Sequence, residues 1–135
     1  MTGREMFCVE RLRCDVFVTE QGITLPELDD DDLGAIQVYL LNQAKTIALA
    51  TCRIFKKDGK WQLGRVAVAS TVRHHHLATE MLQAVHSFLQ ERKAKEINCH
   101  AQLTAIPLYK KLGYEKRGPV FLEGGIKHVA MSKRL

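Results

Sequence analysis

The chain of 135 residues is long enough to form one domain with a sizeable core, because 46% of its residues are hydrophobic. Its 20 Lys and Arg exceed its 15 Asp and Glu by five. This modest basic excess suits an anionic ligand, but the basic residues are too scattered to predict a nucleic-acid-binding surface. The composition excludes disordered and collagen-like chains, and no apolar run approaches the roughly 20 residues of a membrane helix.

The N-terminal and cysteine patterns predict a cytoplasmic protein that does not bind membranes. The first ten residues, MTGREMFCVE, lack the apolar stretch of a signal peptide. Four cysteines are present and none forms a C-x-x-C pair, which argues against a zinc knuckle or a redox dithiol. We therefore expect reduced thiols at Cys8, Cys14, Cys52 and Cys99.

The first half of the chain predicts a short helix followed by a three-stranded antiparallel meander. Apolar residues recur at helical spacing over 8–19, and the turn-rich segment 23–34 follows. Strand-like runs, separated by short polar turns, then occupy 37–41, 45–55 and 61–69.

The second half changes period twice. Apolar residues at helical spacing predict a helix from Leu77 to about Lys93. Alternation over 97–101 predicts a strand, and Thr104 is placed to cap a further helix that ends before Gly113. Two last strands are expected at 114–122 and 126–132, joined by a hairpin loop over 123–125.

This element order predicts a single α/β (α+β) domain over 1–135, with a mixed sheet and packed helices. The strands near 66 and 98 should run parallel, because a helix connects them. A cleft for a ligand opens where neighbouring strands splay beyond such a junction.

The segment between Ala69 and Leu77 is a strand-to-helix turn that carries one arginine and three adjacent histidines. Free backbone N–H groups at a helix start, helped by Arg73, suit an anion such as pyrophosphate, although a solvated turn has the same composition. His74, His75 and His76 cannot all face one ion from a regular element, and no Cys or carboxylate is close in sequence, so we expect no metal site.

The run from Gly64 to Leu82 resembles the acetyl-coenzyme A motif of the GNAT superfamily of N-acetyltransferases, a strand followed by R/Q-x-x-G-x-G/A. Arg73 and Ala78 occupy its first and last positions, whereas His76 replaces the usual glycine and His74 replaces another common one. Residues 102–114 resemble the family's N-x-x-A-x-x-x-Y-x-K-x-G-F/Y, with Gln102 in place of Asn. Segments 16–21, 99–102 and 121–131 are similar to the ElaA-like subgroup, so that the resemblance covers nearly the whole chain.

The resemblance implies a mostly antiparallel central sheet with helices on both faces and a splayed parallel strand pair that forms the acetyl-CoA cleft. It implies that the strand backbone of Val66, Ala67 and Val68 pairs with pantetheine, and that one of its N–H groups faces the thioester oxygen. The remaining positions implied at the cofactor are Arg73, His74, His75, His76, Leu77, Ala78, Thr79, Gln102 and Tyr109.

Acyl transfer to an amine needs a proton for the departing thiolate and a base for the acceptor. Tyr109 is our candidate acid, since a phenol is protonated at neutral pH. A carboxylate near position 65 is common in the family, but Arg65 stands here. We therefore take His100 as first choice for the base, with Glu123, His128 or a water relay as alternatives.

Five carboxylates fall within six residues, at Glu27 and Asp29 to Asp32. They are a solvated loop or, on the sharper hypothesis, a cleft wall that attracts a cationic amine. We expect acceptor contacts at Glu20, Asp29, Asp30, Glu123 and His128, so that segments 20–33 and 121–128 choose the acceptor.

The sequence thus favours an N-acetyltransferase that moves acetyl from acetyl-CoA to a primary amine by direct attack, without a metal. The alternative is a non-catalytic CoA-binding or protein-interaction module on the same fold. We expect a small-molecule amine as partner, no nucleic acid, and a monomer or homodimer.

Overall fold

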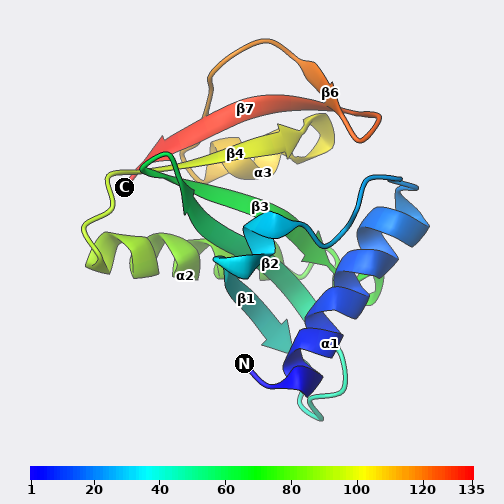
Figure 1. Cartoon of the computed structure of the whole chain (residues 1–135). Coiled ribbons are helices and arrows are strands. Elements are labelled where there is room, and N and C mark those ends of the chain that lie inside the picture. The colour runs from blue at the N-terminus through cyan, green and yellow to red at the C-terminus, as the bar shows by residue number, and fades with distance from the viewer.

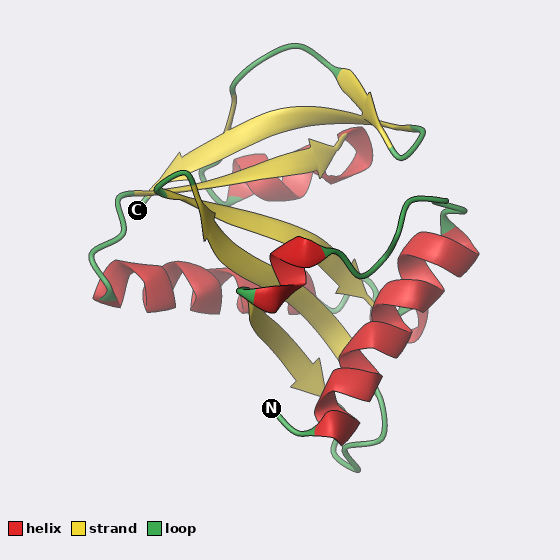
Figure 2. Ribbon diagram, viewed as in Figure 1, coloured by secondary structure: helices red, strands yellow, loops and turns green.

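The computed structural model describes all 135 residues, and a seven-stranded sheet with helices on both faces forms its centre (Figure 1, Figure 2). The strand order is β1-β2-β3-β4-β7-β5, with β6 also paired to β7. The strands are β1 Ile36–Leu41, β2 Ala48–Lys57, β3 Lys60–Val68, β4 Glu96–Gln102, β5 Glu115–Lys116, β6 Phe121–Glu123 and β7 Ile126–Arg134; the helices are α1 Gly3–Arg13, α2 Leu77–Glu91 and α3 Ile106–Lys111. The mixed, mostly antiparallel sheet expected from the sequence is confirmed.

The parallel pair β3 and β4 stays together over a short distance only. It begins at Trp61 opposite Ile97 and ends at Leu63 opposite Cys99. Beyond that point β3 still pairs with β2 and β4 still pairs with β7, so each strand follows a different neighbour. The expected splay is therefore present from Gly64 and His100 onward.

Two cores hold the helices to the sheet. On one face, α2 buries Met81, Leu82, Val85 and Leu89 against the central strands. On the other face, α1 and the turns after it pack on Ala48 and Ala67. Each fully buried aliphatic side chain of this kind contributes about 1.5–3 kcal/mol to the free energy of unfolding, relative to an exposed one. Burial of these side chains therefore holds both helices on the sheet.

The N-terminal helix is longer than the sequence pattern predicted. It begins at Gly3 because Thr2 and Glu5 form a reciprocal capping box, which the expectation of a start at residue 8 missed. After Arg13 the winding changes to a π-helix over Cys14–Glu20. π-Helical turns are rare and often occur at functional sites.

Two other expectations were wrong. Thr104 does not cap α3, because Leu103–Ala105 form a 3-10 turn and Ala105 precedes the helix, with Pro107 in its first turn. The expected strand 114–122 is split into β5 and β6 by the segment 117–120, in which Pro119 has no N–H to give to the sheet.

The hairpin loop before β7 is confirmed, since Gly124 and Gly125 both have left-handed backbones, with φ of 58° and 79°. The second strand begins at Ala48 rather than residue 45, because the Asn42 side chain accepts the N–H groups of Thr46 and Ile47 and closes a turn. None of the helices combines the length and the apolar character that crossing a membrane requires.

Candidate active site

The cleft between β3 and β4 has a bulged strand as one wall. Thr51 of β2 faces Ala67 and Arg53 faces Gly64, so that Arg65 and Val66 both stand opposite Cys52. Arg65 takes a left-handed backbone with φ of 52°. Such a bulge bends its strand, which carries β3 away from β4 and leaves the β4-facing backbone edge of residues 64–68 unpaired.

The loop from β3 to α2, residues 69–76, continues this wall beyond the end of β3. His74 and His76 adopt left-handed backbones, with φ of 69° and 61°. No side chain caps α2, so the N–H groups of Leu77, Ala78 and Thr79 have no capping partner. Free N–H groups at the positive end of a 15-residue helix make this a site suited to a phosphate group.

Arg73 ties this loop to the end of the N-terminal helix. Its guanidinium donates to both carboxylate oxygens of Glu20, at 2.6 and 2.8 Å, and its Nε donates to the carbonyl oxygen of Val68 at 3.2 Å. The Arg73 hydrogen bonds lower the pKa of Glu20. Two residues expected to bind different substrates therefore bind each other.

Tyr109 of α3 lies in the core on the α2 side of the sheet. It is 5% exposed, belongs to the same core as Cys99, and packs edge-on against Tyr114 at 5.1 Å between ring centroids. Burial raises the pKa of Tyr109 well above its ordinary value, so the phenol keeps its proton at neutral pH. Tyr114 differs, because its Oη is 2.7 Å from His86 Nε2.

The three alternatives for the base lie together on the other side of β4. Alternation along β4 buries Cys99 and Ala101 on the core face and leaves His100 exposed on the opposite one. His100 Nδ1 is 3.0 Å from Glu123 Oε1, and His128 Nε2 is 3.8 Å from Glu123 Oε2. Phe121 packs against both imidazoles. We call His100, Phe121, Glu123 and His128 the hairpin cluster.

A backbone contact determines how His128 faces its neighbours. Its Nδ1 is 2.7 Å from the carbonyl oxygen of Ile126, so this nitrogen donates a hydrogen bond and carries a proton. The Nε2 that faces Glu123 then carries the lone pair of the neutral imidazole. The hairpin cluster can accept a proton at His100 and stabilise the resulting charge with Glu123.

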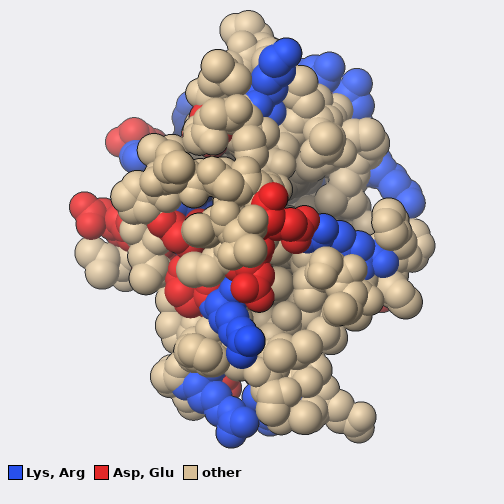
Figure 3. Space-filling model, turned by 90° about the vertical axis from the view of Figure 1, so that its right-hand side faces the viewer, with Lys and Arg blue, Asp and Glu red and all other residues tan.

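Much of the acidic segment 27–32 is occupied by three arginines. Arg13 is fully buried and binds Glu27 at 2.6 Å and Asp32 at 2.9 Å. Arg53 binds Asp29 at 2.7 Å, and Arg65 approaches Glu27 within 3.3 Å. Figure 3 shows acidic side chains gathered on this face beside basic ones.

These contacts change the electrostatics that the sequence suggested. Burial alone would raise the pKa of Asp32, but hydrogen bonds from Arg13, the Asp29 backbone and Arg53 outweigh it and hold this pKa well below its usual range. Asp30, which is exposed, and Glu123 keep no arginine partner. Sequence reasoning missed the arginine network; the signal was Arg13, a charge directly after Leu12 on the buried side of an amphipathic helix.

The two segments expected to choose the acceptor meet in space. A β-carbon on Gly124 would lie 3.0 Å from Ile23 Cγ2 and 3.7 Å from Leu25 Cδ1, so the β6–β7 hairpin tip touches the segment after the N-terminal helix. Gln102, expected at the cofactor, has its side-chain amide bonded to Gln21. These contacts border the hairpin cluster on the side opposite Tyr109.

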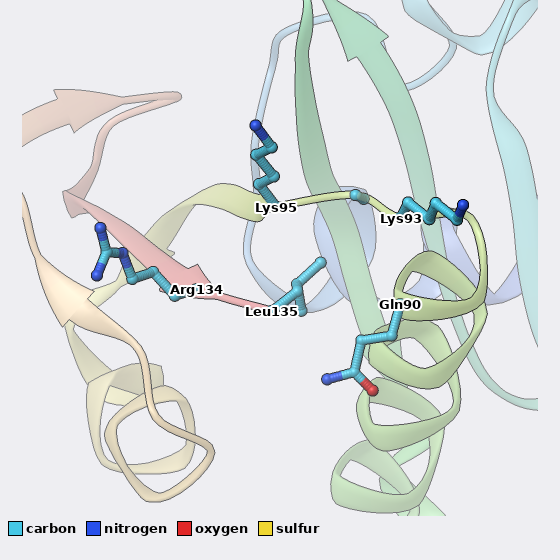
Figure 4. A pocket seen from close by; sticks show the side chains of 6 residues that line it. Gln90, Lys93, Lys95, Arg134 and Leu135 are labelled. Carbon is cyan, nitrogen blue, oxygen red and sulfur yellow. The ribbon is translucent and has the colours of Figure 1, made fainter.

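The basic residues at the far end of the sheet do not form an anion site. A cavity of about 570 Å³ lies at the far end of the sheet, where Lys93, Lys95 and Arg134 point away from one another (Figure 4). Divergent cations cannot close on one anion. No group of three or more His, Cys, Asp or Glu side chains is arranged to hold a metal ion.

Known proteins resemble this chain in sequence and in architecture. The profile of the family described as acetyltransferase (GNAT) domain matches residues 29–135. The chain is 34% identical over 135 residues to a UPF0039 protein of Schizosaccharomyces pombe. This match covers 98% of this chain and 89% of the relative. Protein ElaA of Escherichia coli is 25% identical, covering 97% of this chain and 88% of the relative.

Two crystal structures show the same fold. That of Escherichia coli ElaA matches with a TM-score of 0.87 at 23% identity, over 98% of this chain and 92% of that one. That of an acyl-CoA N-acyltransferase from Pseudomonas aeruginosa matches with a TM-score of 0.87 at 24% identity, over the same shares. Both agree with the mixed sheet and its parallel pair.

Proposed function

The chain belongs to the GNAT family of acetyltransferases, with protein ElaA among its relatives, and we propose that it transfers acetyl from acetyl-CoA to a primary amine by direct attack in a ternary complex. The observation that carries this proposal is the splay after Leu63 and Cys99, with Tyr109 on one side and the hairpin cluster on the other. On this proposal, a donor and an acceptor of protons act from opposite faces of β4.

The residues present suit acetyl-CoA. The uncapped start of α2, with the backbone of residues 73–79, would hold the pyrophosphate. The unpaired edge of β3 at Val66, Ala67 and Val68 would pair with pantetheine and offer an N–H to the thioester oxygen. When bound, acetyl-CoA supplies a thioester whose carbonyl carbon the amine attacks, so that a C–N bond forms and the C–S bond breaks.

Protons move at two places. The Tyr109 Oη–H donates to the departing sulfur, because burial keeps this phenol protonated. His100 accepts the proton that the amine loses, directly or through a water, and Glu123 stabilises the imidazolium at 3.0 Å. Glu123 and His128 also face the incoming amine; Glu20 and Asp29 act mainly through their arginine partners.

A thiol-release screen tests the function. Acetyl-CoA is combined with spermidine, glucosamine, free lysine and a lysine-containing peptide, and released thiol is measured alongside CoA affinity. We expect turnover with at least one small amine. His100→Gln should lower kcat/KM about 100-fold or more, because general base catalysis contributes at least that much.

The alternative function has its own outcome. The missing glycine at His76 and the absence of a carboxylate base at Arg65 favour a non-catalytic module on the same fold. Tight CoA binding with no thiol release from any amine would establish that module, and absence of CoA binding would exclude both functions.

A further inference from the structure

Two adjacent residues at the end of the N-terminal helix reach the two walls of the cleft. Glu20 binds Arg73, which lies in the loop from β3 to α2. We call this loop, which we propose holds the cofactor, the cofactor loop. Gln21 binds Gln102, at the end of β4. One helix end therefore spans the gap that opens where β3 and β4 part.

The contact between the two glutamines is reciprocal. Gln102 Nε2 donates to Gln21 Oε1 at 2.9 Å, and Gln21 Nε2 donates to Gln102 Oε1 at 3.3 Å. Gln102 follows His100 by two residues and so lies on the same face of β4. On its β3 side, this end of β4 has no strand partner, so Gln21 holds a part of the strand that the sheet secures on one edge only.

The π-helical winding explains how Gln21 comes to this place. Its N–H bonds the carbonyl of Val16, five residues back, and the N–H of Ile23 bonds the carbonyl of Phe17. Gly22, with φ of 66°, then turns the chain sharply toward the hairpin tip. An α-helical continuation would take one residue fewer per hydrogen-bonded turn and would shift Gln21 away from β4.

We propose that the Gln21–Gln102 amide pair is a positioning contact that fixes the acceptor side of the cleft, by holding the end of the N-terminal helix against β4, two residues from His100. The inference rests on the proposed function for its kinetic consequence. Without the pair, the acceptor must order this wall when it binds, and each side chain so ordered costs about 0.5–1.5 kcal/mol. The acceptor KM should therefore rise several-fold, up to about tenfold.

The experiment compares Gln21→Met, Gln102→Met and the double variant, which keep side-chain length but remove the amides. Gln90→Met, an exposed position on α2 far from the cleft, is the matched control. With the best amine from the screen, we expect a higher acceptor KM, kcat within about twofold, and unchanged CoA affinity. The double variant should lose no more than either single one, because both remove the same contact.

Hydrogen exchange at the amides of Gly22 and Ile23 gives a readout that needs no turnover. Each Met variant at 21 or 102 should speed this exchange several-fold, whereas Gln90→Met should not. Unchanged exchange overturns the positioning role, even if the wild type proves inactive and the proposed function fails. Faster exchange with an unaltered acceptor KM, or with equally weakened CoA binding, also overturns it, since the pair would then be merely structural.

Discussion

Two buried tyrosines pack together in the core on the α2 side of the sheet, and their hydroxyl groups have different surroundings. Tyr109 and Tyr114 pack edge to face in one core. The hydroxyl of Tyr114 is engaged by His86, while Tyr109 is on the helix that follows the free end of β4. The Tyr114 hydroxyl is thus engaged within the core, whereas no hydrogen-bond partner holds the hydroxyl of Tyr109.

Tyr109→Phe tests this division at the scale of one oxygen atom. We expect kcat to fall about 100-fold or more, because general acid catalysis contributes at least that much, while CoA affinity stays within about twofold. Steady-state kinetics and calorimetric titration with CoA measure the two effects. Tyr114→Phe is the control: it should cost about 1 kcal/mol of stability and leave kcat near the wild-type value. Equal kcat for both variants would refute the acid role.

At the scale of elements, the cofactor loop uses two histidines where its motif has glycine. His74 and His76 hold left-handed backbones that cost an L-residue about 1–2 kcal/mol each. The loop therefore has left-handed backbone angles of the kind glycine adopts easily, at two residues that carry β-carbons and are strained by them. His75, between them, does not have a left-handed backbone.

His76→Gly should release this strain and open the start of α2. We expect a gain of about 0.5–1 kcal/mol in unfolding free energy, after the entropic cost of glycine, and CoA binding that is several-fold tighter. Urea unfolding and CoA titration measure both. His75→Gly makes the same chemical change where no strain exists, so it should gain neither. CoA affinity unaffected by His76→Gly would show that the β-carbon does not obstruct the cofactor.

The sequence predicted most elements because their signals are local. The spacing of Met81, Leu82 and Val85 reports one helix face, and the Gly124-Gly125 turn reports a hairpin. The ranges that failed depend on contacts distant in sequence or on unusual winding. The pairing of Gln21 with Gln102 joins residues 81 positions apart, and no periodicity reveals a π-helix.

The candidate site was predicted in the same uneven way. The motif resemblance names Tyr109 and residues 73–79 as candidates, and His100, Glu123 and His128 are named singly, without their mutual contacts and without Phe121. The sequence alone gives no partners for the carboxylates of segment 27–32, because Arg13, Arg53 and Arg65 come from three separate elements. Opposite charges that pair only after folding leave no local trace.

Across the whole molecule, pKa shifts of partly buried groups make stability depend on pH. The network around Asp32 and Asp29 lowers the pKa of both carboxyl groups, so its contribution persists above pH 4 and is lost in stronger acid. Glu10 has the opposite sign, since burial raises its pKa. His86 acts in a higher pH window, because its ordinary pKa of 6.5 lies above those of the carboxyl groups. Its imidazole joins α2 to Tyr114 and lies near Lys133 of β7.

His86 is expected to set the stability loss between pH 6.5 and 4. Burial, followed by the charge of Lys133, lowers its pKa from 6.5 to about 4. Between these values the unfolded chain binds a proton that the folded chain refuses, so the unfolding free energy falls as the pH falls, by at most about 3 kcal/mol. Urea unfolding midpoints at several pH values measure this slope.

His86→Gln can still hydrogen-bond Tyr114 but cannot titrate, so the dependence of its unfolding free energy on pH should be flat between pH 6.5 and 4. His75→Gln, which replaces an exposed imidazole, should keep the wild-type slope. A wild-type slope in His86→Gln would assign the loss to the carboxylates instead.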